Sequence, residues 1–397
     1  MPAITPKIIV RESVRRVYRI LRVLSERYVN PRFPAAHEFV FWRLRLLLAL
    51  RKCTQAERDD INLISKSGLL SPEYSHFLHR HIQNTERSTL FYLRSWANCY
   101  DPRKPFPGFH PGIYEEELSR AGRAVHGDPF AHYIRENHPP GPWNFEVLTP
   151  ATPIRPFAPD PRAALHIHAF YPDLVSDILG ALLHNISRPT LLISVTTETA
   201  RSAVDDLLAS TYDGPAEIRI VPNRGRDLGP LFTGFRDEIM QRFDIVGHIH
   251  TKKSPHIGTS GSRWFQFLLE HAIGGKAPML DIALSAMCND ARIGMIFPDD
   301  PQAIGWTNNR LEAEKIASHM PPLAWREAFV FPAGSVFWAR TEAIKPFFAL
   351  DWTWDDYPQE PLPVDGTMLH AVERLLPFVV EVGGYRLVLS HVPGIVK

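Results

Sequence analysis

Apolar positions along the chain follow two different periods, and the change falls near residue 163. Before it, in residues 39–52, 55–66 and 71–83, apolar residues recur every three or four positions, as they do on one face of an α-helix. After it, short apolar runs alternate with stretches of helical spacing. This pattern predicts a helical amino-terminal region followed by an α/β domain.

The second part of the chain is typical of a mostly parallel sheet whose strands are joined by helices. The predicted strands cover 164–170, 190–196, 217–221, 245–251, 293–297 and a region at 329–340, and the predicted helices cover 172–185, 199–210, 230–242 and the segment with Leu369, Val372 and Leu376. Ligands bind such sheets at the carboxyl ends of the strands, so candidate functional residues are sought there.

Changes in composition predict three segments. Residues 1–143 are expected to hold a basic amphipathic helix and two helical-hairpin repeats, whose tyrosines lie 18 and 19 residues apart. Residues 144–162 contain five prolines and are predicted to be a linker. Residues 163–397 are predicted to form the α/β domain.

Positive charge is concentrated at the amino-terminal end. Residues 1–52 hold twelve Lys or Arg against three acids, although the net charge of the whole chain is +1. Val14, Val17 and Leu21 lie on one face of the predicted basic helix, and most of its arginines lie elsewhere. Two interpretations stay open. The helix binds an anionic membrane surface, or it packs on the main body of the protein with its basic face in water. No motif that reads nucleic acid accompanies the charge.

The overall composition excludes several classes of protein. With 45% apolar and 22% charged residues, the chain is an ordinary globular protein and not a disordered or fibrous one. No apolar run reaches the ~18–20 residues that cross a bilayer. Three cysteines are too few and too irregular for a disulfide framework or a cysteine zinc site, and they suggest a reducing compartment.

The ends of the first and third predicted strands carry candidate ligand-binding residues. His168 and Phe170 lie at the end of the first strand, where an aromatic side chain can stack on a nucleotide base, although both residues also suit a core and turn. The third strand leads into residues 222–230, Pro-Asn-Arg-Gly-Arg-Asp-Leu-Gly-Pro. Arginines around a flexible glycine, just before a helix, are typical of a phosphate or sugar pocket. The alternative is that Asp227 caps the helix and the arginines are solvated.

The fourth predicted strand ends in Gly-His-Ile-His-Thr-Lys-Lys, from residue 247. His248 and His250 project to the same side because side chains alternate along a strand. Imidazoles suit zinc or iron, but no carboxylate follows the pair nearby. Lys252 and Lys253 could neutralise a leaving diphosphate without a metal.

Acidic residues follow two later elements. Asp299 and Asp300 come after the strand at 293–297, where they could bind a cation or a sugar hydroxyl or form a turn. Glu360 and Asp365 lie in an acidic loop before the last predicted helix. Such a loop can supply a general base, and its alternative role is helix capping.

Five stretches together resemble the rhamnan synthesis protein F family of bacterial polysaccharide glycosyltransferases. They are HIHAFYPDL, PNRGRDLGP, HIHTKKSPH, FPAGSVFWAR and PLPVDGTMLHAVERLLP, which run in order from His166 to about Tyr385. The stretch DPFAHYIRENHPPGPW also resembles helical segments found beside glycosyltransferase domains. The family resemblance implies transfer of L-rhamnose, or a related deoxyhexose, onto a growing surface glycan.

The order of motifs is also similar to the GT-A fold of nucleotide-sugar transferases. In that fold an Asn-Arg-Gly turn follows the third strand, and the next strand ends in Asp-x-Asp. Here the second motif reads His-Ile-His-Thr-Lys, so the Mg²⁺ or Mn²⁺ dependence that Asp-x-Asp implies loses its usual ligands, and no cofactor or metal ligand is assigned. Asp365 matches the base of inverting enzymes, with Glu360 in reserve. The residues expected to bind the donor are His168, Phe170, Asn223, Arg224, Arg226, Asp227, His250, Lys252, Lys253 and Asp299.

The resemblance further implies a nucleotide-sugar donor, dTDP-β-L-rhamnose, and a lipid-linked glycan acceptor. It places the enzyme in the cytoplasm, peripheral on the inner face of the plasma membrane. Two functions of other classes stay open at this point. One is a non-catalytic scaffold of a polysaccharide assembly complex. The other is a metal-dependent phosphoesterase built on His248, His250 and the aspartates at 299 and 300.

Overall fold

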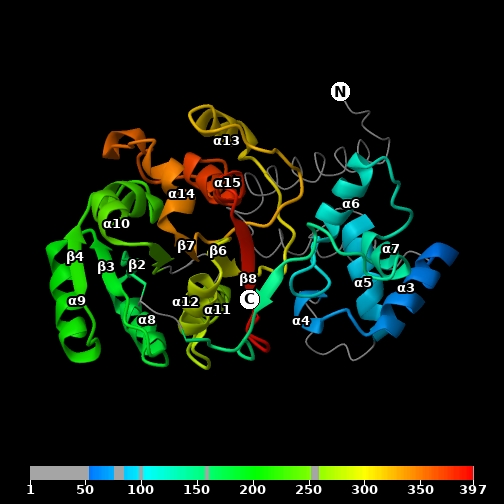
Figure 1. Cartoon of the computed structure of the whole chain (residues 1–397), viewed down its shortest axis with the longest axis horizontal. Helices are drawn as coiled ribbons and strands as arrows, with labels where there is room; N and C mark the ends of the chain where they lie inside the picture. Colours follow the sequence, from blue (N-terminus) through cyan, green and yellow to red (C-terminus); the bar gives the residue numbers. More distant parts are fainter. Residues whose placement is uncertain (1–52, 76–84, 98–101, 157–160, 252–258, 397) are drawn as a thin grey trace, which may run out of the picture. The chain divides into compact units, whose positions relative to one another are not determined.

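The computed structural model describes residues 53–75, 85–97, 102–156, 161–251 and 259–396. The chain forms two compact units (Figure 1). The first contains the residues up to Asn144 together with Pro301–Ile304, and the second contains the rest, from Phe145 onward. The predicted basic helix, the predicted helix at 39–52 and the two lysines after the fourth strand lie outside the described residues.

The first unit is helical, as the apolar spacing predicts. Its helices are α3 (Gln55–Ser67), α4 (Pro72–Ser75), α5 (Thr85–Ala97), α6 (Pro111–Arg120) and α7 (Pro129–Arg135). Helix α3 begins at a capping box between Thr54 and Glu57 and ends at Gly68, whose φ of 67° suits a helix stop. Tyr114 and Tyr133, from the two ends of one predicted repeat, are buried with rings 5.6 Å apart.

Asp128 begins helix α7 from a buried position. Its Oδ1 accepts hydrogen bonds from the backbone N–H groups of Phe130, at 2.9 Å, and Ala131, at 3.1 Å. Burial raises the pKa of Asp128 from 3.8 to about 7, because these hydrogen bonds only partly offset desolvation and the nearby Asp60 raises the pKa further. The folded unit therefore binds a proton here more tightly than the unfolded chain does.

We expect the stability of the first unit to fall as the pH rises from about 4 to about 7, and Asp128→Asn to remove this dependence. The raised pKa means that the stabilisation is complete below the unfolded pKa and is lost as the pH passes the folded one. A rise of about three units in the pKa of Asp128 corresponds to about 4 kcal/mol of free energy. At pH 8 the free energy of unfolding of Asp128→Asn is therefore expected to exceed that of the natural protein by about 4 kcal/mol. Urea unfolding at pH 5 and pH 8 measures it. Asp59→Asn, at an exposed site on α3, is the control, and an unchanged pH slope in the Asp128 variant would contradict the assignment.

The second unit is built on one mixed sheet of eight strands. They are β1 (Glu146–Leu148), β2 (Ala163–His168), β3 (Thr190–Val195), β4 (Ala216–Ile220), β5 (Ile245–His250), β6 (Ile293–Pro298), β7 (Phe337–Arg340) and β8 (Arg386–Ser390). Their order is β1-β8-β6-β7-β5-β2-β3-β4, and only β7 runs antiparallel to its neighbours. The predicted α/β class with a mostly parallel sheet is thus confirmed. Strand β1 lies inside the segment predicted as a linker, which therefore contributes to the sheet.

Helices cover both faces of the sheet (Figure 1). One face carries α8 (Val175–Leu182), α9 (Glu198–Thr211), α11 (Thr259–Ala272) and α12 (Met279–Asn289), and the other carries the π-helical turn η2 (Pro230–Gly234), α10 (Arg236–Arg242), α14 (Thr341–Phe348) and α15 (Met368–Val382). Helix α13 (Arg310–Ala317) packs on α15. No helix of the described residues is long and apolar enough to cross a membrane.

Several predicted elements are interrupted in the structure. The predicted helix at 230–242 is divided into η2 and α10 at Phe235, where a side-chain N–H of Arg219 bonds the carbonyl of Gly234. The predicted strand region at 329–340 forms a strand only from Phe337 onward, because residues 332–335 make a turn in which Gly334 has φ 81°. Since β7 is antiparallel, this turn lies at the carboxyl edge of the neighbouring strands.

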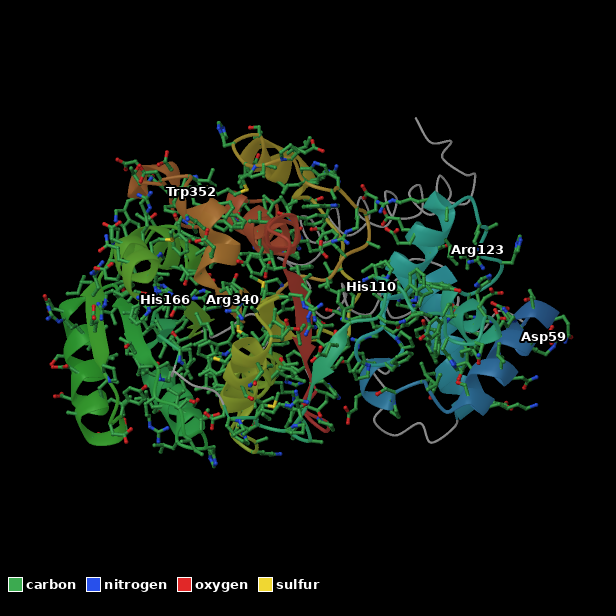
Figure 2. The ribbon with its side chains drawn as sticks, in the orientation of Figure 1. Asp59, His110, Arg123, His166, Arg340 and Trp352 are labelled. Carbon is green, nitrogen blue, oxygen red and sulfur yellow. The ribbon has the colours of Figure 1, made fainter. Side chains whose placement is uncertain are left out.

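The two faces of β2 differ in chemistry. Leu165 and Ile167 point into the large apolar core under α8, α11 and α12. His166 and His168 alternate with them and so face the opposite side. His166, which is labelled in Figure 2, contacts Phe235 there, with ring centroids 5.5 Å apart. This polar side of the central strands leads to the candidate site.

Candidate active site

The turn after β4 has a backbone that only glycine allows at its centre. Gly225 has φ 71° and the following Arg226 has φ 47°. A Cβ atom on Gly225 would lie 2.7 Å from Cα of Gly229 and 2.9 Å from the ring of Tyr357. Tyr357 is itself buried, and its hydroxyl lies 2.8 Å from Oγ1 of Thr233. Tyr357 belongs to the acidic loop, residues 355–367, so its ring packs this loop against the turn.

Gly225→Ala is expected to destabilise the second unit by about 2–5 kcal/mol, the sum of a left-handed backbone penalty and of overpacking. Gly384→Ala is a matched control, because Gly384 also has a positive φ, of 80°, but nothing lies within 4 Å of its added Cβ. The control is expected to lose only about 1–2 kcal/mol. Chemical denaturation measures the free energy of unfolding of both variants. If both lose the same amount, the close approach of the added Cβ at residue 225 to Gly229 and Tyr357 has no cost.

The two arginines of this turn point toward the acidic loop and α15. Nη1 of Arg224 donates to Oδ1 of Asp355 at 2.6 Å, and the Asp355 side chain is 96% exposed. Nε of Arg224 is buried and has no hydrogen-bond partner among the described residues. Arg226 donates from Nη2 to the carbonyl of Pro363 at 3.0 Å and from Nη1 lies 3.3 Å from Nε2 of His370. Asn223, beside them, is exposed.

Asp365 is held by two side chains from the segment before α13. Oδ1 accepts from Nδ2 of Asn309 at 2.6 Å, and Oδ2 accepts from the hydroxyl of Thr307 at 2.8 Å. Burial raises the pKa of Asp365, but these hydrogen bonds and the charge of Arg374 outweigh it, so the net pKa lies below 3.8. The carboxylate is therefore ionised and fixed in direction, with 31% of its side chain still exposed.

Glu360 lies on the same loop as Asp365. Its Oε1 is 3.6 Å from Nε of Arg226, and its Oε2 accepts from the backbone N–H of Leu362 at 2.9 Å. Arg226 thus joins the turn after β4 to the loop that carries both acidic candidates. The ring of His370 contacts the same arginine on one side and Oγ1 of Thr367 on the other. Its pKa falls to about 4 because of burial and then the charge of Arg226, against the opposing charge of Asp365.

Asp227 faces the histidines of β5. Its Oδ2 lies 3.2 Å from Nε2 of His248 and 4.0 Å from Nε2 of His250. Burial raises the pKa of Asp227, but the nearby His250 and the hydrogen bond from His248 outweigh burial and hold it far below 3.8. Nε2 of His250 also lies 2.9 Å from the carbonyl of Gly334. The predicted common direction of the two histidines is what brings both toward Asp227.

His168 and Phe170 lie at the carboxyl end of β2. His168 is 5% exposed, and Phe170 keeps 42% of its surface exposed. The rings are 6.4 Å apart, and Tyr171 meets Phe170 edge to face. An aromatic side chain this exposed at the ligand edge of a sheet is available for stacking.

The remaining predicted residues are Asp299 and the two lysines after β5. Asp299 follows β6 and is fully buried, with its backbone N–H bonded to the carbonyl of Ser390. Lys252 and Lys253 lie outside the described residues. Across the described part of the chain, no group of three or more His, Cys, Asp or Glu side chains is arranged to hold a metal ion.

Sequence reasoning missed several residues that complete the site, namely His166, Ser194, Thr307, Asn309 and His370. One signal could have found the first of them. His-x-His occurs at the ends of both β2 and β5, the first and fourth strands predicted from the sequence. The register pairs His166 with His248 and His168 with His250. No local signal marks Thr307 and Asn309, which lie more than fifty residues before Asp365.

The fold is that of an α/β protein, and a polar, arginine-bearing cluster of side chains lies at the carboxyl edge of its sheet. A sequence model of rhamnan synthesis protein F matches residues 146–385, so the chain belongs to the rhamnan synthesis protein F family. The match covers most of the second unit.

Two curated relatives come from Xanthomonas campestris pv. campestris, strains B100 and ATCC 33913. Each is described as uncharacterized protein WxcX and is 26% identical to this chain over 249 residues. The aligned region covers 61% of this chain and 34% of the relative, so the chain spans about a third of the length of these proteins.

Proposed function

We propose that the second unit is a glycosyltransferase of polysaccharide synthesis, which moves L-rhamnose or a related deoxyhexose from dTDP-β-L-rhamnose to a growing surface glycan. The observation that carries the proposal is the link through Arg226. It joins a cationic turn to the loop that carries Asp365. Membership of the rhamnan synthesis protein F family supports the class of reaction.

The donor diphosphate would bind at the turn after β4. Arg224 is suited to this because its partner Asp355 is almost fully exposed, and an exposed ion pair stabilises by at most about 1 kcal/mol. A phosphate could therefore replace Asp355 at Nη1 of Arg224. Arg226 and the exposed Asn223 would assist, and Lys252 and Lys253 would neutralise the leaving group.

Asp365 would act as the general base. It would take the proton of the acceptor hydroxyl while that oxygen attacks the anomeric carbon from the side opposite the diphosphate. The bond between sugar and diphosphate breaks, and dTDP leaves with the electron pair, so the sugar is transferred with inversion. Stabilisation of the diphosphate by the arginines is the electrostatic part of the catalysis. Asp227 would bind a hydroxyl of the sugar or the ribose.

The acceptor and the location belong to the same proposal. A glycan on a lipid carrier at the cytoplasmic face of the inner membrane would be the acceptor, and the basic amino-terminal residues would favour an anionic membrane surface. A divalent metal is not assigned a ligand here, because the strand that usually ends in Asp-x-Asp ends in His-Ile-His-Thr-Lys.

Binding of nucleotide sugars to the full chain tests the proposal. A donor present at about a hundred times its dissociation constant should raise the melting temperature by about 5 °C or more. The screen includes dTDP-rhamnose and other nucleotide sugars, each with and without EDTA, and calorimetry confirms any shift. Absence of binding by every nucleotide sugar would contradict a transferase and favour the scaffold. Hydrolysis that needs a metal and no acceptor would favour the phosphoesterase.

A further inference from the structure

A continuous chain of hydrogen-bonded side chains crosses three strands beneath the candidate site. It runs from Asp227 through His248, His166 and Ser194 to His168, and we call these five residues the imidazole chain. Nδ1 of His248 and Nδ1 of His166 lie 2.9 Å apart, and Oγ of Ser194 lies 3.1 Å from Nε2 of His166 and 2.9 Å from Nδ1 of His168. The contact between Asp227 and His248, at 3.2 Å, completes it.

The strand register places these side chains on one face. His166 pairs with His248 across β2 and β5, and His168 pairs with Ser194 across β2 and β3. The middle of the imidazole chain is sealed, since His166 and Ser194 are 0% exposed and His248 is 1% exposed. Its two ends, Asp227 and His168, keep some exposed surface. The imidazole chain therefore connects two positions at the carboxyl edge of the sheet.

With its imidazoles uncharged, the imidazole chain has one possible order of hydrogens. Ionised Asp227 only accepts, so His248 carries its hydrogen on Nε2 and its Nδ1 is bare. His166 must then donate from Nδ1, which leaves its Nε2 to accept the single hydrogen of the Ser194 hydroxyl. That hydroxyl can now only accept from Nδ1 of His168. Nε2 of His168 is consequently a bare acceptor.

We propose that the imidazole chain fixes His168 as a hydrogen-bond acceptor, so that the site at the end of β2 selects a nucleobase with a ring N–H, such as uracil, thymine or guanine, against cytosine and adenine. The inference rests on the proposed function and names the nucleotide class of that donor. Thymine, the base of the proposed donor, satisfies the requirement.

Three observations support this assignment. Burial lowers the pKa of His168 to about 3, so its ring stays uncharged at neutral pH. Burial, and then repulsion from His248 and His168, also lowers the pKa of His166 strongly. Phe170 stands two residues after His168 with 42% of its surface exposed, where it can stack on a base whose edge meets the histidine.

Paired dissociation constants at pH 8 test the selectivity. The full chain is titrated with UDP and CDP, which differ in the hydrogen at ring N3, and with GDP and ADP, which differ likewise at N1. We expect UDP to bind about tenfold to a hundredfold more tightly than CDP, and GDP more tightly than ADP. In CDP and ADP the ring nitrogen carries no hydrogen, so it and Nε2 of His168 are both acceptors and form no hydrogen bond. In Ser194→Ala, Nδ1 of His168 loses its partner, the ring is free to adopt either tautomer, and the preference should fall below about threefold.

Ser285→Ala is the matched control. Ser285 is also buried, on α12 at the opposite face, and bonds the backbone of Arg155. It should keep the full preference. Equal binding of UDP and CDP by the natural chain, or a preference that survives in Ser194→Ala, would overturn the inference and leave the proposed function intact. Absence of binding by every nucleotide would overturn both.

Nitrogen chemical shifts of the histidine rings give a second measurement that needs no variant. The imidazole chain requires hydrogen on Nδ1 of His168 and His166 and on Nε2 of His248. An extra proton on His248 would reverse every link and place the hydrogen of His168 on Nε2. Observation of that reversed pattern at pH 8 would overturn the inference even if the serine variant failed to fold.

Discussion

Asp365→Asn is expected to lower the turnover of sugar transfer by about 10²–10⁴-fold, the usual contribution of a general base. The amide is of nearly the same size, but it cannot take the proton of the acceptor hydroxyl. Because Asp365 lies on the loop and not in the arginine turn, the dissociation constant of the donor should change little. Initial rates with saturating donor, together with calorimetry of donor binding, separate the two effects.

Two comparisons make this result specific. Asp351→Asn removes another loop carboxylate, which pairs with Arg236 at the surface, and should leave transfer unchanged. Asn309→Ala removes one hydrogen bond to Asp365 and should cost activity with a smaller effect than loss of the carboxylate itself. A folded Asp365→Asn enzyme that transfers sugar at nearly the natural rate would show that another group, with Glu360 next in line, is the base.

Arg224→Ala is expected to weaken the binding of dTDP by about tenfold to a hundredfold, because hydrogen bonds to charged groups contribute about 1.5–3 kcal/mol each. The loss should shrink as salt is raised, since part of it is electrostatic. Arg224→Lys keeps the charge but not the planar pair of donors, so intermediate binding is expected. Calorimetry at two salt concentrations measures both variants.

The matched control for this prediction is Arg201→Ala. Arg201 is an exposed arginine on α9, paired only loosely with Glu198 at 3.9 Å, and its removal should not affect dTDP. If Arg224→Ala binds dTDP as tightly as the control does, the turn after β4 is not the diphosphate site.

Sequence periodicity predicted the central strands of the second unit well, because the alternation of apolar and polar residues that marks a strand is a local pattern. The alternation in residues 164–170 and 245–251 marked β2 and β5, and both strands end within two residues of the expected positions. The arginine turn was recognisable because Gly225 and its neighbours are consecutive. Asp365 could likewise be chosen as a candidate because it lies in a short acidic loop before a helix, and its role stays a prediction.

The remaining features depend on pairings that no local pattern reports. Pairing of β2 with β5, strands about eighty residues apart, is what turns two His-x-His sequences into one connected set. The contacts of Asp365 with Thr307 and Asn309 come from the fold of a loop before α13. Strand β1 was hidden because the prolines around it outweighed its three strand residues.

The anchoring of Tyr357 against Gly225 has a consequence for how a ligand would enter. The tyrosine ring at Gly225 and the hydrogen bond from Arg226 to Pro363 join the turn and the acidic loop at two separate points, and the tyrosine hydroxyl at Thr233 joins the loop to η2. The distance between the arginines and Asp365 is therefore set by contacts within the protein itself. Less conformational freedom is left to lose when a substrate arrives, and this preorganisation favours both affinity and rate.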